Sequence, residues 1–146
     1  MRRILFTLAA LVTMHSVSAF ESACQDYYPK TMQVKSAVTE LCLEGFAVGY
    51  TNDGMLSLYS TEFLTKDDIV FSRMIKRKTS FHEESRLPNS IRASATDFSV
   101  PGYDRGHLTP FKDRAYSYDV NSFANIVLQE SGLNRGAWMQ LEDTVS

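Results

Sequence analysis

The chain has 146 residues, 44% of them hydrophobic and 22% charged, which is typical of one globular domain of modest size. Its formal net charge of −2 argues against a broad polycationic surface for nucleic acid. Positive charge is nevertheless concentrated in one region, because residues 73–114 contain nine Lys and Arg against five Asp and Glu. No low-complexity tract or internal repeat is present in the sequence.

Residues 1–19 have the pattern of a secretory signal peptide. Arg2 and Arg3 give a positively charged start, an apolar stretch follows, and residues 17–19 (VSA) form a small-residue cleavage site. We therefore expect a mature chain that begins at Phe20, is secreted or periplasmic, and has no membrane-spanning segment. An uncleaved membrane anchor is the alternative. The 13 basic and 17 acidic residues that remain after cleavage give a mature charge near −4.

The only two cysteines, Cys24 and Cys42, both lie in the expected mature chain. An oxidising compartment favours their pairing, and closing this loop would stabilise the fold by ~3 kcal/mol in the chain-entropy model. Two cysteines without a C-x-x-C motif do not suggest a metal site. Residues 20–41 contain Pro29 and few periodic apolar residues, so we expect an irregular N-terminal strap that Cys24 holds in place.

The next segments predict a hairpin, a short helix and a long loop. Residues 43–51 and 55–63 are rich in strand-forming residues and flank the turn signal Asn-Asp-Gly at 52–54, which predicts two antiparallel strands. Thr65 and Asp68 form a capping-box pattern before an apolar run, which predicts a helix to about residue 76. Residues 78–100 are polar and interrupted by Pro88, and we expect a surface loop there.

The C-terminal part predicts one more strand and one more helix. Residues 122–128 are a compact apolar run that suggests a buried strand, and residues 130–132 interrupt it. From 134 to 145, Trp138, Leu141 and Val145 recur at helical spacing. Strands, a loop that carries a histidine, a further strand and a helix together predict an α+β domain.

Residues 103–110, with the sequence YDRGHLTP, concentrate the chemistry of the chain. The His107 imidazole titrates near neutral pH and can take a proton from water. Arg105 carries a fixed charge and a planar fork that suits a phosphate group. Gly106 between them allows the backbone to bend or a ligand to approach closely.

This motif and the residues after it resemble the DNA/RNA non-specific endonuclease family, the ββα-metal (His-Me finger) nucleases related to mitochondrial endonuclease G. The DRGH signature at 104–107 is followed by Asn125 and Gln129, which are similar to the family's SN…PQ strand. Residues 134–142 (NRGAWMQLE) match its N-x-x-x-W-x-x-L-E helix. The resemblance covers about residues 40–146 and implies a nuclease core with a central antiparallel sheet. The combination of motifs is specific, whereas DRGH alone would be weak.

The resemblance implies roles for three residues at the reacting phosphate. His107 would be the general base, and Asn134 would bind one Mg²⁺ within a shell of water, with Mn²⁺ as the second candidate metal. An amide oxygen with waters suits a hard cation and not zinc. Glu142 would orient metal-bound water, as the resemblance implies from the family's matching glutamate. Eight residues of regular helix place it about 80° from Asn134, so both side chains can face the same cleft. The imidazole and the hydrated cation would then lie on opposite sides of one phosphorus.

The resemblance also implies how the substrate would be held. Arg105 and Arg77 would bind the scissile phosphate of DNA or RNA. Asp104 would hold neighbouring backbone or an arginine in place and would not be a metal ligand. Contacts limited to phosphate and sugar would make the enzyme indifferent to base sequence. Each residue has a simpler alternative: a structural histidine at 107, a helix N-cap at 134, and solvated charges at 142 and 77.

Two departures from the family pattern leave alternatives open. Leu128 stands where the family usually has proline, and family members continue well beyond the helix at 134–145. We therefore expect residues 42–146 to correspond to the N-terminal, site-bearing part of the nuclease domain, with the C-terminal half missing. A catalytically inactive remnant that at most binds nucleic acid or a partner is the alternative, and a small disulfide-tied binding module is a third. The sequence predicts neither an inhibitor nor an oligomeric state.

Overall fold

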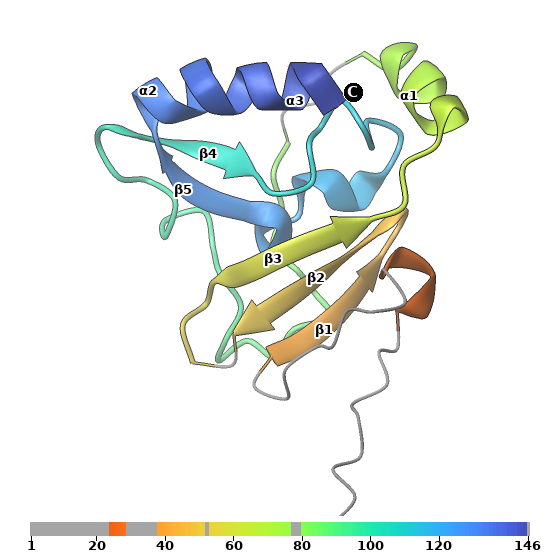
Figure 1. Ribbon diagram of the computed structural model, residues 1–146. Helices are drawn as coiled ribbons and strands as arrows, with labels where there is room; N and C mark the ends of the chain where they lie inside the picture. The colour runs from red at the N-terminus through yellow and green to blue at the C-terminus, as the bar shows by residue number, and fades with distance from the viewer. Residues whose placement is uncertain (1–23, 29–37, 52, 77–79, 146) are drawn as a thin grey trace, which may run out of the picture.

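The computed structural model describes residues 24–28, 38–51, 53–76 and 80–145 (Figure 1). Two antiparallel sheets and a C-terminal helix form the body of the chain, which confirms the α+β class. The expected signal peptide at 1–19 lies outside the described residues. None of the described helices combines the length and the apolar character that a membrane span requires.

The first sheet has three antiparallel strands in the order β1-β2-β3. They are β1 (Val38–Leu43), β2 (Phe46–Thr51) and β3 (Ser57–Glu62), and the pairing of β2 with β3 confirms the predicted hairpin. The prediction of one strand over 43–51 was wrong, because a turn at Glu44 and Gly45 separates β1 from β2. Gly45 permits this turn with a φ of +92°. The strap predicted for 20–41 likewise ends early, since β1 begins at Val38.

The inner face of this sheet forms the larger hydrophobic core. Leu41 and Leu43 of β1 face Val48 and Phe46 of β2, and all four side chains are buried. Leu87 from the long loop and Ala124 from the C-terminal part complete this cluster. The loop therefore covers the sheet and does not simply cross the surface.

The outer face of the sheet is covered by the N-terminal segment 24–28, which contains the 3-10 turn η1 (Gln25–Tyr27). The disulfide Cys24–Cys42 joins it to β1, as predicted. On β3, Thr61 Oγ1 donates a hydrogen bond of 2.6 Å to the carbonyl oxygen of Tyr27. The segment is thus fixed to both edge strands of the sheet, and Ala47 of β2 is fully buried between them.

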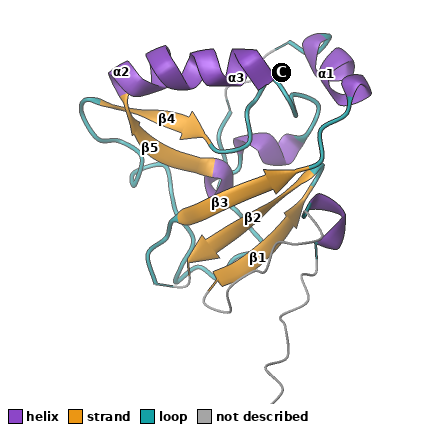
Figure 2. Cartoon of the chain, in the orientation of Figure 1, coloured by secondary structure: helices purple, strands orange, loops and turns teal. Residues whose placement is uncertain are grey.

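Helix α1 (Lys66–Arg73) begins with the predicted capping box. Thr65 Oγ1 accepts from the backbone N–H of Asp68, and the Asp68 carboxylate accepts from the backbone N–H of Thr65. The described residues from 80 to 102, which follow α1 and precede β4, contain loop only, apart from a single bridge between His82 and Ser122 (Figure 2).

The second sheet is the hairpin of β4 (Tyr103–His107) and β5 (Ile126–Glu130), with His107 paired to Ile126. The sequence predicted a loop around His107 and a strand over 122–128, and both predictions need correction. The DRGH motif is itself a strand. Residues 118–125 form the 3-10 turns η2 (Tyr118–Asn121) and η3 (Phe123–Asn125), because the Ser117 and Ser122 side chains cap their first turns.

The C-terminal helix lies along the β4–β5 hairpin (Figure 1). It consists of α2 (Ser131–Leu133), the π-helical turn η4 (Asn134–Trp138) and α3 (Met139–Val145). The helix therefore begins three residues before the predicted start. Gly136 has non-helical torsion angles (φ −114°, ψ −107°) and kinks the path. Interruptions of this kind in a helix are common near functional sites.

A buried ionic cluster joins β3, α1 and the segment after β4. Arg114 is only 1% exposed, and its guanidinium pairs with Glu62 at 3.1 Å and with Asp68 at 3.0 Å. It also donates to the carbonyl oxygen of Phe63 and to the hydroxyl of Tyr116. Because one cation serves two carboxylates and two neutral acceptors, the three segments depend on it for their mutual placement.

We expect Arg114→Met to lower the free energy of unfolding by about 3–5 kcal/mol, because it leaves the carboxylates of Glu62 and Asp68 without their cation. Urea unfolding measures this loss. As a control, Lys112→Met removes the cation of an exposed pair with Asp143 and should leave the midpoint nearly unchanged. Equal effects of the two substitutions would contradict a structural role for the buried cluster.

Candidate functional site

The β4–β5 hairpin has two differently occupied faces, and the predicted site residues are divided between them. Side chains alternate along a strand, so Arg105 and His107 point to one face of β4 while Asp104 points to the other. The first face lies on the second hydrophobic cluster, which contains Phe123, Ile126 and Phe98. The second face meets the C-terminal helix through Asp104.

The His107 ring is held at the end of β4 by a hydrogen bond and by neighbouring aromatic rings. It is 6% exposed, and its Nε2 lies 3.1 Å from Oδ1 of the buried Asn121. Phe81 and Phe111 contact the imidazole with ring centroids at 5.7 Å and 6.2 Å. An amide oxygen can only accept, so the tautomer that fits this contact donates from Nε2. That tautomer suits a base that acts through Nδ1.

Asn125 connects the end of β4 to the segment that contains Asn121. The Asn125 side chain is fully buried and accepts from Thr109 N at 2.9 Å. Its Nδ2 donates to the carbonyl oxygens of Thr109 and Val120, each at 3.0 Å. Leu108, the residue after His107, donates its N–H to the backbone carbonyl oxygen of Asn125. Val120, the residue before Asn121, accepts from the Asn125 side chain. Asn125 thus bonds to both segments.

The motif glycine is explained by its neighbour on β5. A Cβ atom at Gly106 would lie 2.2 Å from the side chain of Gln129. Gln129 is itself buried and crosses the strand at this point. A side chain at 106 would therefore displace Gln129 from between the hairpin and the helix, so that the glycine serves close packing at this position.

Arg105 lies beside the same aromatic rings as His107. Its guanidinium carbon is 5.4 Å from the Phe81 ring centroid and 5.6 Å from that of Phe123, and Nη2 donates to Ala95 O at 3.1 Å. Phe81 therefore contacts both the imidazole and the guanidinium, and the structure brings these two predicted site residues together. Arg77, the other predicted phosphate ligand, lies outside the described residues.

Asn134 meets the hairpin through Asp104. Its Nδ2 donates to Asp104 Oδ2 at 3.3 Å, and Arg135 forms a fork on the same carboxylate with two bonds of 2.7 Å. These hydrogen bonds, that of Arg135 first, lower the pKa of Asp104. Asn134 is not the helix N-cap, because Glu130 caps the first turn through the N–H of Leu133.

The donor atoms around Asn134 fit a hydrated hard cation. The amide nitrogen faces Asp104, so the amide oxygen is directed away from the carboxylate and can coordinate a metal. Within the described ranges, no group of three or more His, Cys, Asp or Glu side chains comes together as a metal site. The Asn134 amide oxygen, supplemented by water, could therefore hold a hard cation.

Glu142 lines a cavity of about 350 Å³ beneath the C-terminal helix. Leu108, Glu62, Asp113 and Trp138 line the same cavity. The expected angle of about 80° between Asn134 and Glu142 assumed a regular helix, and the kink at Gly136 removes that assumption. The role of Glu142 toward metal-bound water therefore stays a prediction.

Glu62 and Asp113 are two of the three acidic side chains that line this cavity, the third being Glu142. Burial raises the pKa of Glu62 to about 7, although the ion pair with Arg114 opposes this shift and Asp113 adds to it. Asp113 is 1% exposed. The cavity is thus an apolar space with an acidic wall that changes charge near neutral pH.

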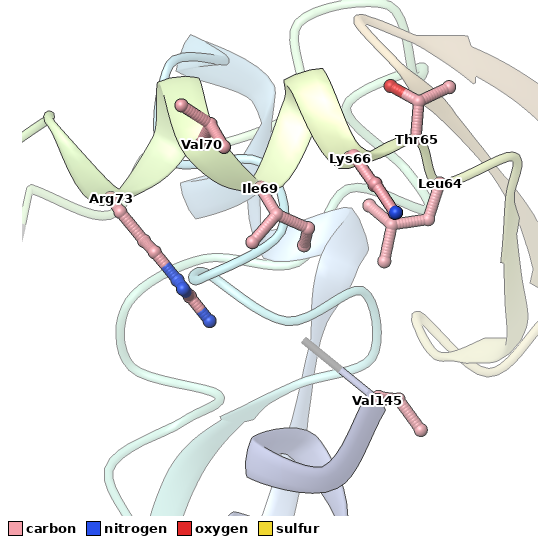
Figure 3. Close-up of a pocket in the computed structure, with 7 residues that line it drawn as sticks. All are labelled: Leu64, Thr65, Lys66, Ile69, Val70, Arg73 and Val145. Carbon is pink, nitrogen blue, oxygen red and sulfur yellow. The ribbon is translucent and has the colours of Figure 1, made fainter.

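Another hollow, of about 370 Å³, lies between α1 and the end of α3 (Figure 3). Ile69 and Val70 of α1 and Val145 of α3 line it together with Leu64. None of the predicted site residues lines it, so this hollow has no part in the candidate site.

The sequence missed Asn121, which contacts the His107 ring directly. Only its position four residues before Asn125 could have drawn attention to it, and spacing alone does not distinguish one buried amide from another. The structure therefore groups His107, Arg105 and Asn121 on one face of β4, and Asn134 and Asp104 on the other. Among the described residues β4 pairs only with β5.

Comparison with known proteins shows the family to which the chain belongs. The model of the DNA/RNA non-specific endonuclease family matches residues 25–146. A nuclease of Syncephalastrum racemosum is 30% identical over 104 residues, which cover 67% of this chain and 32% of that protein. The mitochondrial nuclease of Saccharomyces cerevisiae is 27% identical over 104 residues, which cover 68% of this chain and 32% of the yeast protein. The chain thus spans about a third of the length of these relatives.

The fold is similar to that of a chain in the crystal structure of an EndoG/EndoGI complex. The TM-score is 0.66 at 23% sequence identity, and the alignment covers 73% of this chain and 46% of the other. This similarity supports the ββα-metal nuclease fold.

We expect Asn125→Ala to lower the free energy of unfolding by about 2–5 kcal/mol, because Thr109 and Val120 lose buried hydrogen-bond partners. Chemical denaturation measures this change. The matched control is Asn134→Ala, which removes an amide with one long hydrogen bond and should leave the unfolding midpoint close to that of the unmodified protein. Comparable losses at both positions would contradict the distinction between a structural and a surface amide.

Glu62 predicts a decline of stability as pH rises. Its pKa in the folded protein, about 7, is above the ordinary value of 4.5, so the folded state binds the proton more tightly. The stabilisation is complete below pH 4.5 and is lost as pH rises through 7, a change of about 1–3 kcal/mol. Urea unfolding between pH 4.5 and 8 should show this decline, and Glu62→Gln should remove it. An unchanged pH profile in Glu62→Gln would contradict the assignment.

Proposed function

Because the chain belongs to the DNA/RNA non-specific endonuclease family, we propose that it is an exported endonuclease that hydrolyses phosphodiester bonds of DNA and RNA. The observation that carries the proposal is the His107–Asn121 hydrogen bond, which fixes the imidazole of the DRGH motif at the end of β4 beside Arg105. The disulfide Cys24–Cys42 supports export to an oxidising compartment, secreted or periplasmic.

In this proposal His107 takes a proton from the attacking water at Nδ1, and Asn121 steadies the imidazolium that forms through its amide oxygen. Arg105 holds the scissile phosphate. Its hydrogen bond to Ala95 uses one of five N–H donors, so other donors are available for phosphate oxygens. Arg77 is proposed as a second phosphate ligand, on the basis of its motif alone.

Asn134 is proposed as the protein ligand of one Mg²⁺ or Mn²⁺, and Glu142 as a residue that orients water of the hydrated cation. A bound divalent ion would neutralise charge on the phosphate and on the leaving oxygen. In this proposal the scissile phosphate lies where both His107 and a cation bound by Asn134 can reach it. Contacts to phosphate alone would not distinguish DNA from RNA or one base from another.

We expect the purified protein to digest plasmid DNA and RNA in the presence of Mg²⁺, and to lose this activity on addition of EDTA. His107→Ala should reduce the rate by at least about 100-fold, because general-base catalysis typically contributes a factor of 10² to 10⁴. Gel electrophoresis of the products measures the rate. His82→Ala is the matched control, since His82 contacts Asn121 and Phe123 through backbone atoms that the substitution retains.

Digestion that persists in His107→Ala would show that the nuclease activity does not arise from this site. Absence of digestion together with retention of nucleic acid in a gel-shift assay would favour a chain that binds nucleic acid without cleaving it.

A further inference from the structure

Arg135, the residue after the proposed metal ligand, forms a two-bond ion pair with Asp104 on the helix-facing side of the hairpin. Its Nε donates to Asp104 Oδ2 and its Nη2 to Asp104 Oδ1, both at 2.7 Å. The Arg135 side chain is 73% exposed, whereas that of Asp104 is 19% exposed. The guanidinium therefore closes over a largely covered carboxylate from the solvent side, in the fork geometry that arginine favours.

Asp104 links this arginine to the metal-binding amide. The same Oδ2 atom that accepts from Arg135 Nε also accepts from Asn134 Nδ2 at 3.3 Å. An amide group can turn by 180° and exchange its oxygen and nitrogen, but only the oxygen can coordinate a cation. A carboxylate beside the nitrogen selects one of these orientations, and here it selects the one that directs the oxygen away from Asp104.

We propose that Arg135 is a positioning residue for the amide of Asn134. By holding both oxygens of Asp104, it fixes the acceptor that orients the Asn134 oxygen toward the site of the divalent cation. This inference rests on the proposed function, in which Asn134 is the metal ligand.

Arginine suits this task because its fork fixes the plane of the carboxylate. Lysine would supply one donor at a time and would leave the carboxylate free to rotate. It could then turn Oδ2 away from Asn134, and the amide would sample both orientations. Since only one orientation binds the cation, the apparent metal affinity falls with the population of that orientation.

The charge of Arg135 has the opposite effect and must be held constant in a test. A positive charge near the site repels a divalent cation, so removing it would favour binding while loss of the fork would weaken binding. Arg135→Lys keeps the charge and changes only the geometry, which makes it the informative substitution. Asp104→Glu tests the other partner in the same way, because it keeps the negative charge and moves the carboxylate.

The test is a titration of the purified protein with Mn²⁺ alone, followed by the electron paramagnetic resonance signal of the free ion. We expect Arg135→Lys and Asp104→Glu each to raise the dissociation constant three- to tenfold, with an unchanged thermal midpoint. Lys112→Gln breaks an exposed ion pair with Asp143, which lies on the same C-terminal helix as Arg135. This variant should bind Mn²⁺ as the unmodified protein does. An unchanged dissociation constant in Arg135→Lys and Asp104→Glu would overturn the inference.

Asn134→Ala separates this result from the proposed function. If it abolishes Mn²⁺ binding while Arg135→Lys has no effect, Asn134 remains the metal ligand and only the role of Arg135 is overturned. If Asn134→Ala binds Mn²⁺ normally, the metal site itself is wrongly assigned and both proposals fail.

Discussion

The buried amide of Asn125 is the constraint on which the candidate site depends. Its side chain satisfies backbone groups of Thr109 and Val120 and so helps to hold their two segments together. The first segment follows His107, and the second precedes Asn121. Because buried backbone groups require partners, this one side chain determines that the imidazole meets the Asn121 oxygen at the end of β4.

The hairpin then separates two kinds of chemistry. Aromatic rings cover the face with His107 and Arg105, where an uncharged surrounding suits proton transfer and an immobilised guanidinium. The other face carries a carboxylate, an amide and an arginine in one hydrogen-bonded group. A single strand thus supplies residues to both groups through the alternation of its side chains.

The sequence predicted elements whose signals are local and missed those that depend on distant partners. The turn signal at 52–54 and the capping box of Thr65 and Asp68 act within a few residues, and the hairpin of β2 and β3 and the capping box are both found. The strand β4 was not predicted, because Asp104, Arg105 and Gly106 have little strand propensity and only the pairing with β5 makes them extended. Within the candidate site, the motifs predicted roles for His107, Arg105 and Asn134, and these roles stay predictions. The contact with Asn121 arises from the 3-10 turns and has no counterpart in the sequence pattern.

The N-terminal segment held by Cys24 has a consequence for how the protein would lose its structure. It lies on the face of the three-stranded sheet opposite the core. On the core side, Ala124 of η3 packs in the same hydrophobic cluster as the residues of β1 and β2. Reduction of the disulfide would therefore first uncover the outer face of β2, far from the imidazole. A reducing environment would shorten the lifetime of the folded chain without changing the residues of the candidate site. The stability of the fold and the chemistry of the site therefore depend on separate parts of the molecule.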